Sequence, residues 1–218
     1  MDPAVDLVVP IKRLDRAKSR LRGAVPGPHA DVVLALLLDT LTAAASAAGV
    51  RRVLVVCEDP RAVKAVDEAL PGMGVESVDE RGLSGLNAAL QHGADLLRAG
   101  DPHGVVGALQ ADLPALRPAE LASAIAEAGG RRAFCADRPG TGTTLLLSAP
   151  GGPLDPRFGP GSAAAHLAGG ATPVGDGLAT LRCDVDTAAD LAVAIGLGLG
   201  PHTAKFIDPF VAGRATDR

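Results

Sequence analysis

The sequence predicts an α/β fold, a three-layer sandwich in which helices cover both faces of a mixed, mostly parallel sheet. Short aliphatic runs alternate with helical stretches of roughly 10 to 18 residues through most of the chain. One run, Val105 to Leu109, is continuously apolar, which is typical of a central strand covered on both sides. The 218 residues are 47% hydrophobic but only 2% aromatic, so Ala, Val and Leu must form most of the core. We expect a single domain over residues 1–205 and a tail over 206–218.

The first half of the chain follows a regular strand and helix order. Pro10 and Gly49 end the first strand and the first helix, and Asp59-Pro60 is typical of an N-cap followed by Pro at the first helical position. Ser84 is expected to cap the third helix, which Gly100 ends, and Pro118 opens the fourth. Strands are expected at 5–9, 53–57, 75–78 and 105–109, and helices at 31–48, 60–70, 84–99 and from 118 onward.

The second half breaks this order. Two apolar runs, 133–136 and 143–148, are separated by a glycine-containing turn too short for a crossover helix, so at least one strand there should be antiparallel. Residues 150–162 form a long loop rich in Gly and Pro, which we interpret as a lid or substrate loop. A helix is expected over 187–199, and the polar segment after Gly200 is expected on the surface.

Composition argues against several classes of protein. A net charge of −4 and a pI near 5.7 give no diffuse attraction for nucleic acid. Three widely spaced cysteines without a C-x-x-C pair indicate neither a disulfide scaffold nor a zinc or iron–sulfur site, and they suit a reducing cytoplasm. The N-terminus lacks the features of a signal peptide. Residues 32–50 are strongly apolar, but Asp39 in their middle favours a buried helix over a membrane span.

Carboxylates follow two of the apolar runs. Asp112 lies just after the 105–109 run, and Asp184 and Asp186 follow a second run and are two residues apart. On an extended segment these two would point to the same side, roughly 7 Å apart at Cα. Since open α/β sheets bind ligands at the carboxyl ends of their strands, the three Asp predict an oxygen-coordinated Mg²⁺ or Mn²⁺. The alternative is that Asp186 caps the helix at Thr187 and Asp112 caps a turn.

A basic segment follows the first predicted strand and should emerge at the same edge of the sheet. Its cations could neutralise a bound polyphosphate, or they could form a solvated amphipathic turn. The residues are Lys12, Arg13, Lys18, Arg20 and Arg22.

Three glycine-containing segments could approach a ligand closely. Residues 158–162 end in Ser162 at a helix start, which suits either a phosphate or an ordinary Gly-Pro turn with an N-cap. Residues 140–144 suit either an oxyanion contact or a hairpin turn. In the segment 82–87, Gly82 and Gly85 permit the approach of a planar ligand and Asn87 could hydrogen-bond a base or sugar, although a capped helix start explains the pattern as well.

Several well-known signatures are absent. There is no G-x-x-x-x-G-K-[ST], and the formal dinucleotide fingerprint at 159–164 follows a Pro-rich loop where that motif requires a strand. The five histidines form no pair at metal-ligand spacing, and no Ser or Cys lies in a nucleophile motif. The sequence therefore does not suggest covalent catalysis.

Six fragments, in order from about Val8 to Leu191, together resemble one family. They are V-V-P-I-K-x-x-x-x-A-K-S-R-L, G-L-x-x-x-L-N-x-A-L, Q-A-D-L-P-A-L, G-T-G-T-T-L-L, F-G-P-G-S-A-A-A-H and D-V-D-T-x-x-D-L. The family is the guanylyltransferase of deazaflavin coenzyme F420 biosynthesis, which joins a phosphorylated three-carbon acid to GMP from GTP. The resemblance implies a Rossmann-like nucleotidyltransferase sandwich similar to that of molybdopterin and sugar nucleotidyltransferases.

The resemblance also implies roles for individual residues. Asp112, Asp184 and Asp186 would hold Mg²⁺, with Mn²⁺ as a substitute. The glycine-rich first loop of the wider relatives is replaced here by residues 10–21, so Lys12, Lys18 and Arg20 would bind the triphosphate. Gly82, Gly85 and Asn87, singled out above from the residues alone, are the candidate contacts to the nucleotide. The acceptor's phosphate would bind to the amides of Thr144, Gly159 and Ser162, with Gly161 beside them.

Two rival functions stay open at this point. A molybdopterin or sugar-phosphate nucleotidyltransferase should show the glycine-rich first loop that this chain lacks, and a non-catalytic nucleotide sensor would not need three carboxylates. The acceptor could be phosphoenolpyruvate, 2-phospho-L-lactate or 3-phosphoglycerate, and the high-GC character of the composition favours phosphoenolpyruvate by analogy. We expect a cytoplasmic enzyme with no nucleic-acid or membrane partner, as a monomer or homodimer, whose product passes to the next enzyme of the F420 pathway.

Overall fold

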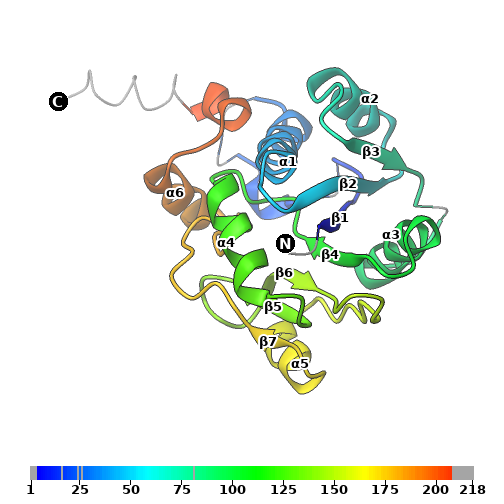
Figure 1. Cartoon of the computed structure of the whole chain (residues 1–218). Helices are drawn as coiled ribbons and strands as arrows, with labels where there is room; N and C mark the ends of the chain where they lie inside the picture. Colours follow the sequence, from blue (N-terminus) through cyan, green and yellow to red (C-terminus); the bar gives the residue numbers. More distant parts are fainter. Residues whose placement is uncertain (1–3, 16, 24, 26, 81, 208–218) are drawn as a thin grey trace.

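A seven-stranded sheet forms the centre of the molecule in the computed structural model, which describes residues 4–207 except 16, 24, 26 and 81 (Figure 1). Its strand order is β3-β2-β1-β4-β6-β5-β7. The strands are β1 (Val5–Ile11), β2 (Val50–Cys57), β3 (Val75–Val78), β4 (Val105–Leu109), β5 (Ala133–Ala136), β6 (Thr143–Leu147) and β7 (Thr172–Pro173).

The directions of the strands confirm the predicted mixed sheet. β1 pairs in parallel with β2 and β4, and β2 pairs in parallel with β3. β6 lies between β4 and β5 and is antiparallel to both, with Gly107 opposite Leu147. A short turn joins β5 to β6, so the chain cannot cross over and must reverse.

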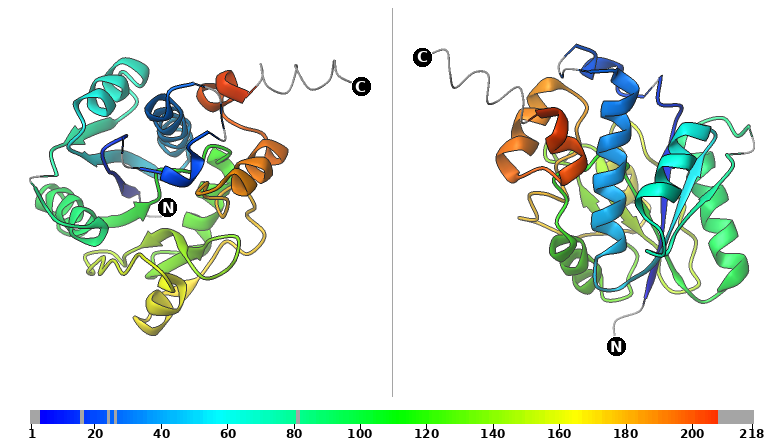
Figure 2. Two further views of the ribbon diagram at one scale, coloured as in Figure 1. Left: turned by 180° about the vertical axis from the view of Figure 1, so that it is seen from behind. Right: turned by 90° about the horizontal axis from the view of Figure 1, so that it is seen from above.

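Helices cover both faces of the sheet (Figure 2). The labelled helices are α1 (His29–Ala45), α2 (Pro60–Ala69), α3 (Leu86–Gly100), α4 (Pro118–Ala128), α5 (Ser162–Ala168) and α6 (Ala188–Leu197), with a 3-10 turn at Ser19–Leu21; a further helical segment at 201–207 is described below. An apolar core lies on each face of the sheet, and successive side chains of β1 point alternately into one and the other. Leu7 and Val9 belong to the core that contains α1, α2 and α4, and Val8 belongs to the core that contains α3 and α5. A third apolar cluster joins α1 to α6 and to the end of the described chain.

Most predicted elements are confirmed, with changes at their ends. The third helix begins at Leu86 with Gly85 as its N-cap, so Ser84 does not cap it. Asp59 caps α2 as predicted, since its side chain accepts a hydrogen bond from the N–H of Arg61. The two-residue strand β7 was not predicted. Among the described helices, none combines the length and the apolar character that crossing a membrane requires.

The segment after Gly200 corrects the expectation of a surface tail. Residues 201–207 are helical, and Thr203 and Ile207 are buried. The buried carboxylate of Asp39 accepts hydrogen bonds from the N–H groups of His202 and Thr203, at 2.9 and 2.7 Å. This explains a charged residue inside the apolar helix α1. The packed domain therefore extends to residue 207, and the rest of the predicted tail, 208–218, lies outside the described residues.

Candidate active site at the carboxyl edge of the sheet

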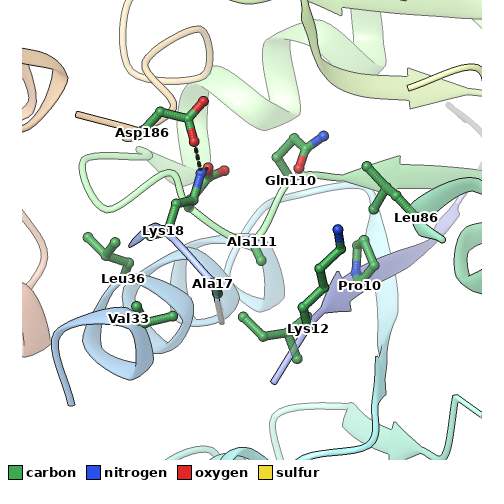
Figure 3. Close-up of a pocket in the computed structure, with 12 residues that line it drawn as sticks. Pro10, Lys12, Ala17, Lys18, Val33, Leu36, Leu86, Gln110, Ala111 and Asp186 are labelled. Atoms are coloured by element: carbon green, nitrogen blue, oxygen red, sulfur yellow. Dashed lines mark hydrogen bonds and ion pairs between the residues drawn. The ribbon is translucent and has the colours of Figure 1, made fainter. Parts of the chain in front are cut away.

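A cavity of about 330 Å³ opens where β1 and β4 end (Figure 3). The two strands are parallel, so the segments that follow them emerge at the same edge of the sheet. Lys12, Lys18 and Gln110 reach the cavity from these segments. The full lining is Pro10, Ile11, Lys12, Ala17, Lys18, Val33, Leu36, Leu86, Gln110, Ala111, Asp112 and Asp186.

Backbone contacts hold the two acidic segments together. The N–H of Val185 donates to the carbonyl of Asp112 at 3.0 Å, which joins the 184–186 segment to the loop after β4. The hydroxyl of Thr40, on α1, accepts a hydrogen bond from the N–H of Leu113 at 2.9 Å and so ties the same loop to α1. Asp112 is only 6% exposed, and its Oδ1 has no hydrogen-bond partner among the described residues. A buried carboxylate oxygen without a partner is costly unless a ligand completes it.

Lys18 lies between two of the three carboxylates. Its Nζ donates to Oδ2 of Asp112 and to Oδ1 of Asp186. Burial by itself would lower the pKa of the Lys18 ammonium, but the charges of the two carboxylates outweigh burial and raise this pKa above its ordinary value. The Lys18 backbone has φ +51° and ψ +41°, a left-handed conformation uncommon outside glycine. The two ion pairs hold the Lys18 ammonium between these carboxylates.

Asp184 carries the most perturbed carboxyl group of the site. Burial and the negative charges of Asp112 and Asp186 together raise its pKa to about 7, against the opposing charge of Lys18. The three carboxylates are therefore electrostatic neighbours, as the sequence predicted. Within the described ranges, no group of three or more His, Cys, Asp or Glu side chains is arranged so that it could hold a metal ion, and this includes the three Asp of the prediction.

The capping alternative for Asp186 does not hold in the structure. Thr187 is the N-cap of α6, and it forms a reciprocal capping box with Asp190. Neither Asp112 nor Asp186 is used as a cap in the hydrogen bonds of the described residues; both pair with Lys18. The two carboxylates therefore point to chemistry or binding more than to local structure.

The basic segment is divided by the fold. Lys12 lines the main cavity and also a neighbouring cavity of about 270 Å³ with Gly82 and Gly85. Lys12, Lys18, Gly82 and Gly85 thus lie along one continuous edge, as the prediction requires. Arg20 is exposed and does not line either cavity, so the structure does not bring it to the site in this conformation.

Asn87 has a different partner from the predicted one. Its Nδ2 donates to the carbonyl of Phe158 at 3.0 Å, and its Oδ1 accepts from the N–H of Phe158 at 2.8 Å. These two bonds engage the side chain from both ends, so Asn87 fastens α3 to the long loop. This corrects the expectation that it hydrogen-bonds a base or sugar.

Ser162 also faces inward. Its side chain is buried and donates to Thr143 at 3.1 Å, and its N–H donates to the carbonyl of Gly159 at 3.1 Å. The expectation that the Ser162 hydroxyl faces an anion is therefore corrected. Gly159 and Gly161 are exposed, with φ of +137° and +74°, and their predicted contact with a phosphate stays a prediction. Thr144 is buried, and its carbonyl accepts the N–H of Gln110 at 2.9 Å, beside the main cavity.

Some residues that shape the site were not predicted. Thr40 and Gln110 carry polar side chains in otherwise apolar surroundings, which is the signal that could have found them. Asp59 was predicted only as a cap, but its second carboxylate oxygen accepts the N–H of Leu14 at 3.0 Å and so anchors the basic segment.

The sheet order and the polar edge define a Rossmann-like nucleotidyltransferase fold. A solved 4-diphosphocytidyl-2C-methyl-D-erythritol synthase matches 89% of this chain and 99% of its own, with a TM-score of 0.61 and 17% identity. A second such synthase, from Anaerococcus prevotii DSM 20548, matches 88% and 95% of the two chains, with a TM-score of 0.55 and 13% identity. At these identities the likeness concerns the fold.

Sequence comparison identifies the family. The model of the family described as guanylyl transferase CofC like matches residues 5–209, and the chain belongs to this family. The phosphoenolpyruvate guanylyltransferase of Salinispora arenicola (strain CNS-205) is 50% identical over 202 residues, which is 91% of each chain. That of Thermomonospora curvata is 46% identical over 217 residues, 97% of this chain and 93% of its own. The predicted family is thereby confirmed.

Proposed function

We propose that this chain transfers GMP from GTP to phosphoenolpyruvate, releasing pyrophosphate and giving the enolpyruvyl-diphosphoguanosine precursor of coenzyme F420. The observation that carries the proposal is the identity of about half of all residues, over nearly the whole length, with chains named phosphoenolpyruvate guanylyltransferase. The charged edge around Lys18 and Asp112 supports it, because a nucleotidyl transfer needs both cations for phosphate and carboxylates for a metal ion.

The reaction requires little proton transfer by groups of the protein. A phosphate oxygen of the acceptor attacks the α-phosphorus of GTP, the bond between that phosphorus and the β-bridging oxygen breaks, and pyrophosphate leaves. The acceptor phosphate is already an anion, so no general base is required. Repulsion between the two phosphates and charge on the leaving group are the obstacles. Lys12 and Lys18 are the lysines that line the cavity, and they would offset the charge that builds on pyrophosphate.

The acidic residues fit a divalent cation. Asp112 offers a buried oxygen without a partner, and Asp184 and Asp186 supply the hard oxygen ligands that Mg²⁺ prefers. Mg²⁺ commonly takes only one or two carboxylates and completes its shell with substrate phosphates and water, so two of these Asp residues suffice. When bound, the ion would screen the acceptor phosphate from the α-phosphate. Mn²⁺ has the same ligand preference.

One experiment tests the transfer and the acceptor together. Purified protein is incubated with GTP and phosphoenolpyruvate, 2-phospho-L-lactate or 3-phosphoglycerate, in Mg²⁺, in Mn²⁺ and in chelator, and pyrophosphate and the nucleotide product are measured. We expect turnover with phosphoenolpyruvate and a divalent cation. Binding of GTP by calorimetry without any turnover would contradict the proposal and favour a nucleotide sensor.

A matched pair of variants tests the carboxylate. Asp112→Asn keeps the shape of the side chain and removes its charge, and we expect turnover to fall by about 100-fold or more. Asp67→Asn on the exposed face of α2 removes one carboxylate elsewhere and should leave turnover unchanged. Equal activity of the two variants would contradict a catalytic role for Asp112.

A further inference from the structure

His166 is a fully buried histidine that the proposed chemistry does not use. It lies on α5 and is 0% exposed. Its ring packs edge-on against Phe158 at a centroid distance of 5.1 Å, and it also contacts the ring of Phe134 at 6.1 Å. A buried imidazole needs partners for both nitrogens, and here each partner comes from a different part of the chain.

The two partners define the state of the ring. The backbone N–H of Arg157 donates to Nε2 at 3.0 Å, so Nε2 is an acceptor and carries no proton. A neutral ring then carries its proton on Nδ1, which donates to the hydroxyl of Thr143 at 2.9 Å. The neutral state agrees with the surroundings, since burial and the charge of Arg132 together lower the pKa of His166 to about 4.

These bonds join the two sides of the predicted acceptor site. Thr143 is the first residue of β6 and precedes Thr144, whose carbonyl accepts the N–H of Gln110, a residue that lines the main cavity. Arg157 belongs to the long loop, two residues before Gly159. Ser162 adds a third contact by donating its hydroxyl to the same Thr143 oxygen. The loop and the strand are thus linked through one imidazole ring and one hydroxyl.

We propose that His166 is a positioning residue for the phosphorylated acceptor: it holds the loop around Gly159 at a fixed separation from the start of β6 without contacting the substrate. The inference rests on the proposed function, because it assumes that the acceptor's phosphate binds between these two segments. It differs from a purely structural role, since loosening this link should weaken the binding of the acceptor and leave the binding of GTP unchanged. Lys12, Gly82 and Gly85 line a cavity to which His166 does not contribute, and the partners of His166 among the described residues are others.

Four substitutions separate the contributions. His166→Gln keeps an acceptor near Nε2 for the N–H of Arg157, His166→Asn keeps a donor near Nδ1 for Thr143, and His166→Phe keeps the ring volume without either bond. Thr143→Val removes the hydroxyl from the other end with little change in volume. His103→Gln on an exposed turn is the matched control. Urea unfolding is measured first, so that only variants folded under the assay conditions are compared.

The readouts are the Kd of phosphoenolpyruvate and the Kd of GTP by calorimetry, with KM and kcat for each substrate. In His166→Phe and Thr143→Val we expect the Kd and KM for the acceptor to rise about tenfold, with the Kd of GTP unchanged, and in His166→Gln and His166→Asn smaller rises. Acceptor affinity within about twofold of the natural chain in the folded variants, or an equal loss of affinity for GTP, would overturn the inference. Failure of the natural chain itself to bind phosphoenolpyruvate would refute the proposed function. That measurement needs no variant, so it is distinct from a failure of the inference about His166.

Discussion

Acid should destabilise the protein through His166. Burial and the charges of Arg132 and Arg157, opposed by the carboxylate of Asp155, together lower the pKa of the imidazole from an ordinary 6.5 to about 4. In the folded chain the ring therefore stays neutral well below pH 6, whereas in the unfolded chain it binds a proton near its ordinary pKa. The perturbation is a change of pH from about 7.5 to about 5, applied to the natural chain and to His166→Gln.

The sign and the size of the effect follow from the two pKa values. A depressed pKa in the folded state means that the stabilising contribution is present above the unfolded value of 6.5 and is lost as the pH falls toward 4. The full loss would be about 3 kcal/mol, since each pH unit of separation corresponds to roughly 1.4 kcal/mol. Between about pH 7.5 and pH 5 the expected loss is about 2 kcal/mol of the free energy of unfolding.

The assay is urea unfolding of both proteins at several pH values in this interval. Other groups titrate in both chains, Asp184 among them with the opposite sign, so the difference between the two proteins isolates His166. His166→Gln should be less stable than the natural chain at neutral pH, and its disadvantage should shrink by about 2 kcal/mol on acidification. A difference that stays constant across the interval would refute the reasoning, because it would mean that the folded ring takes up a proton like the unfolded one.

Three further substitutions test the packing around the site. Gly93→Ala places a Cβ 2.5 Å from Cγ1 of Val8, so urea unfolding should show a loss of about 2 kcal/mol, and unchanged stability would contradict the close packing of α3 on β1. Asp39→Ala removes the acceptor of two backbone N–H groups of the final helix, and a loss of about 2 kcal/mol with faster amide exchange in 201–207 is expected; protection equal to that of the natural chain would contradict this capping. Thr40→Val leaves the N–H of Leu113 without its acceptor, which should cost about 1 to 3 kcal/mol and slow pyrophosphate release, and undiminished stability would contradict it.

The parts of the fold that depend on local sequence could be predicted. β4 and β5 have the predicted bounds because each is an apolar run ended by polar or turn residues. The antiparallel β6 followed from the length of one turn. The helix at 201–207 could not be predicted, because its N-terminal N–H groups are satisfied by Asp39, which is far away in the sequence. β7 has two residues and is defined only by its pairing with β5.

Some features of the candidate site could likewise be predicted from the sequence, and others could not. The sequence predicted that Asp112 and the 184–186 segment each follow a strand, and this is correct only for Asp112, which follows β4, because residues 174–187 contain no strand. The 184–186 segment reaches the same edge through the N–H of Val185, which donates to the carbonyl of Asp112. Which polar side chains are free for a ligand could not be predicted. Asn87 and Ser162 have the residue types of ligand contacts, but a partner far along the chain uses each of them: Phe158 for Asn87 and Thr143 for Ser162. The type of a residue indicates what its side chain can bind. Whether another part of the chain already binds that side chain is known only from the tertiary structure.

The charge at the cavity restricts what can bind there. Lys12 and Lys18 bring two positive charges to the lining, and Asp112 and Asp186 bring two negative ones, with Asp184 adjacent. Lys18 is engaged by both lining carboxylates, so its charge is already compensated before any phosphate arrives. A nucleoside triphosphate that enters this cavity therefore meets little net positive charge. The phosphate of the acceptor would in addition be repelled by the phosphates of the nucleotide. On the function proposed above, binding both substrates would need additional positive charge beside Asp112, and the unpartnered Oδ1 of that residue, close to the carboxyl of Asp184, is where we propose that a divalent cation accompanies the substrates.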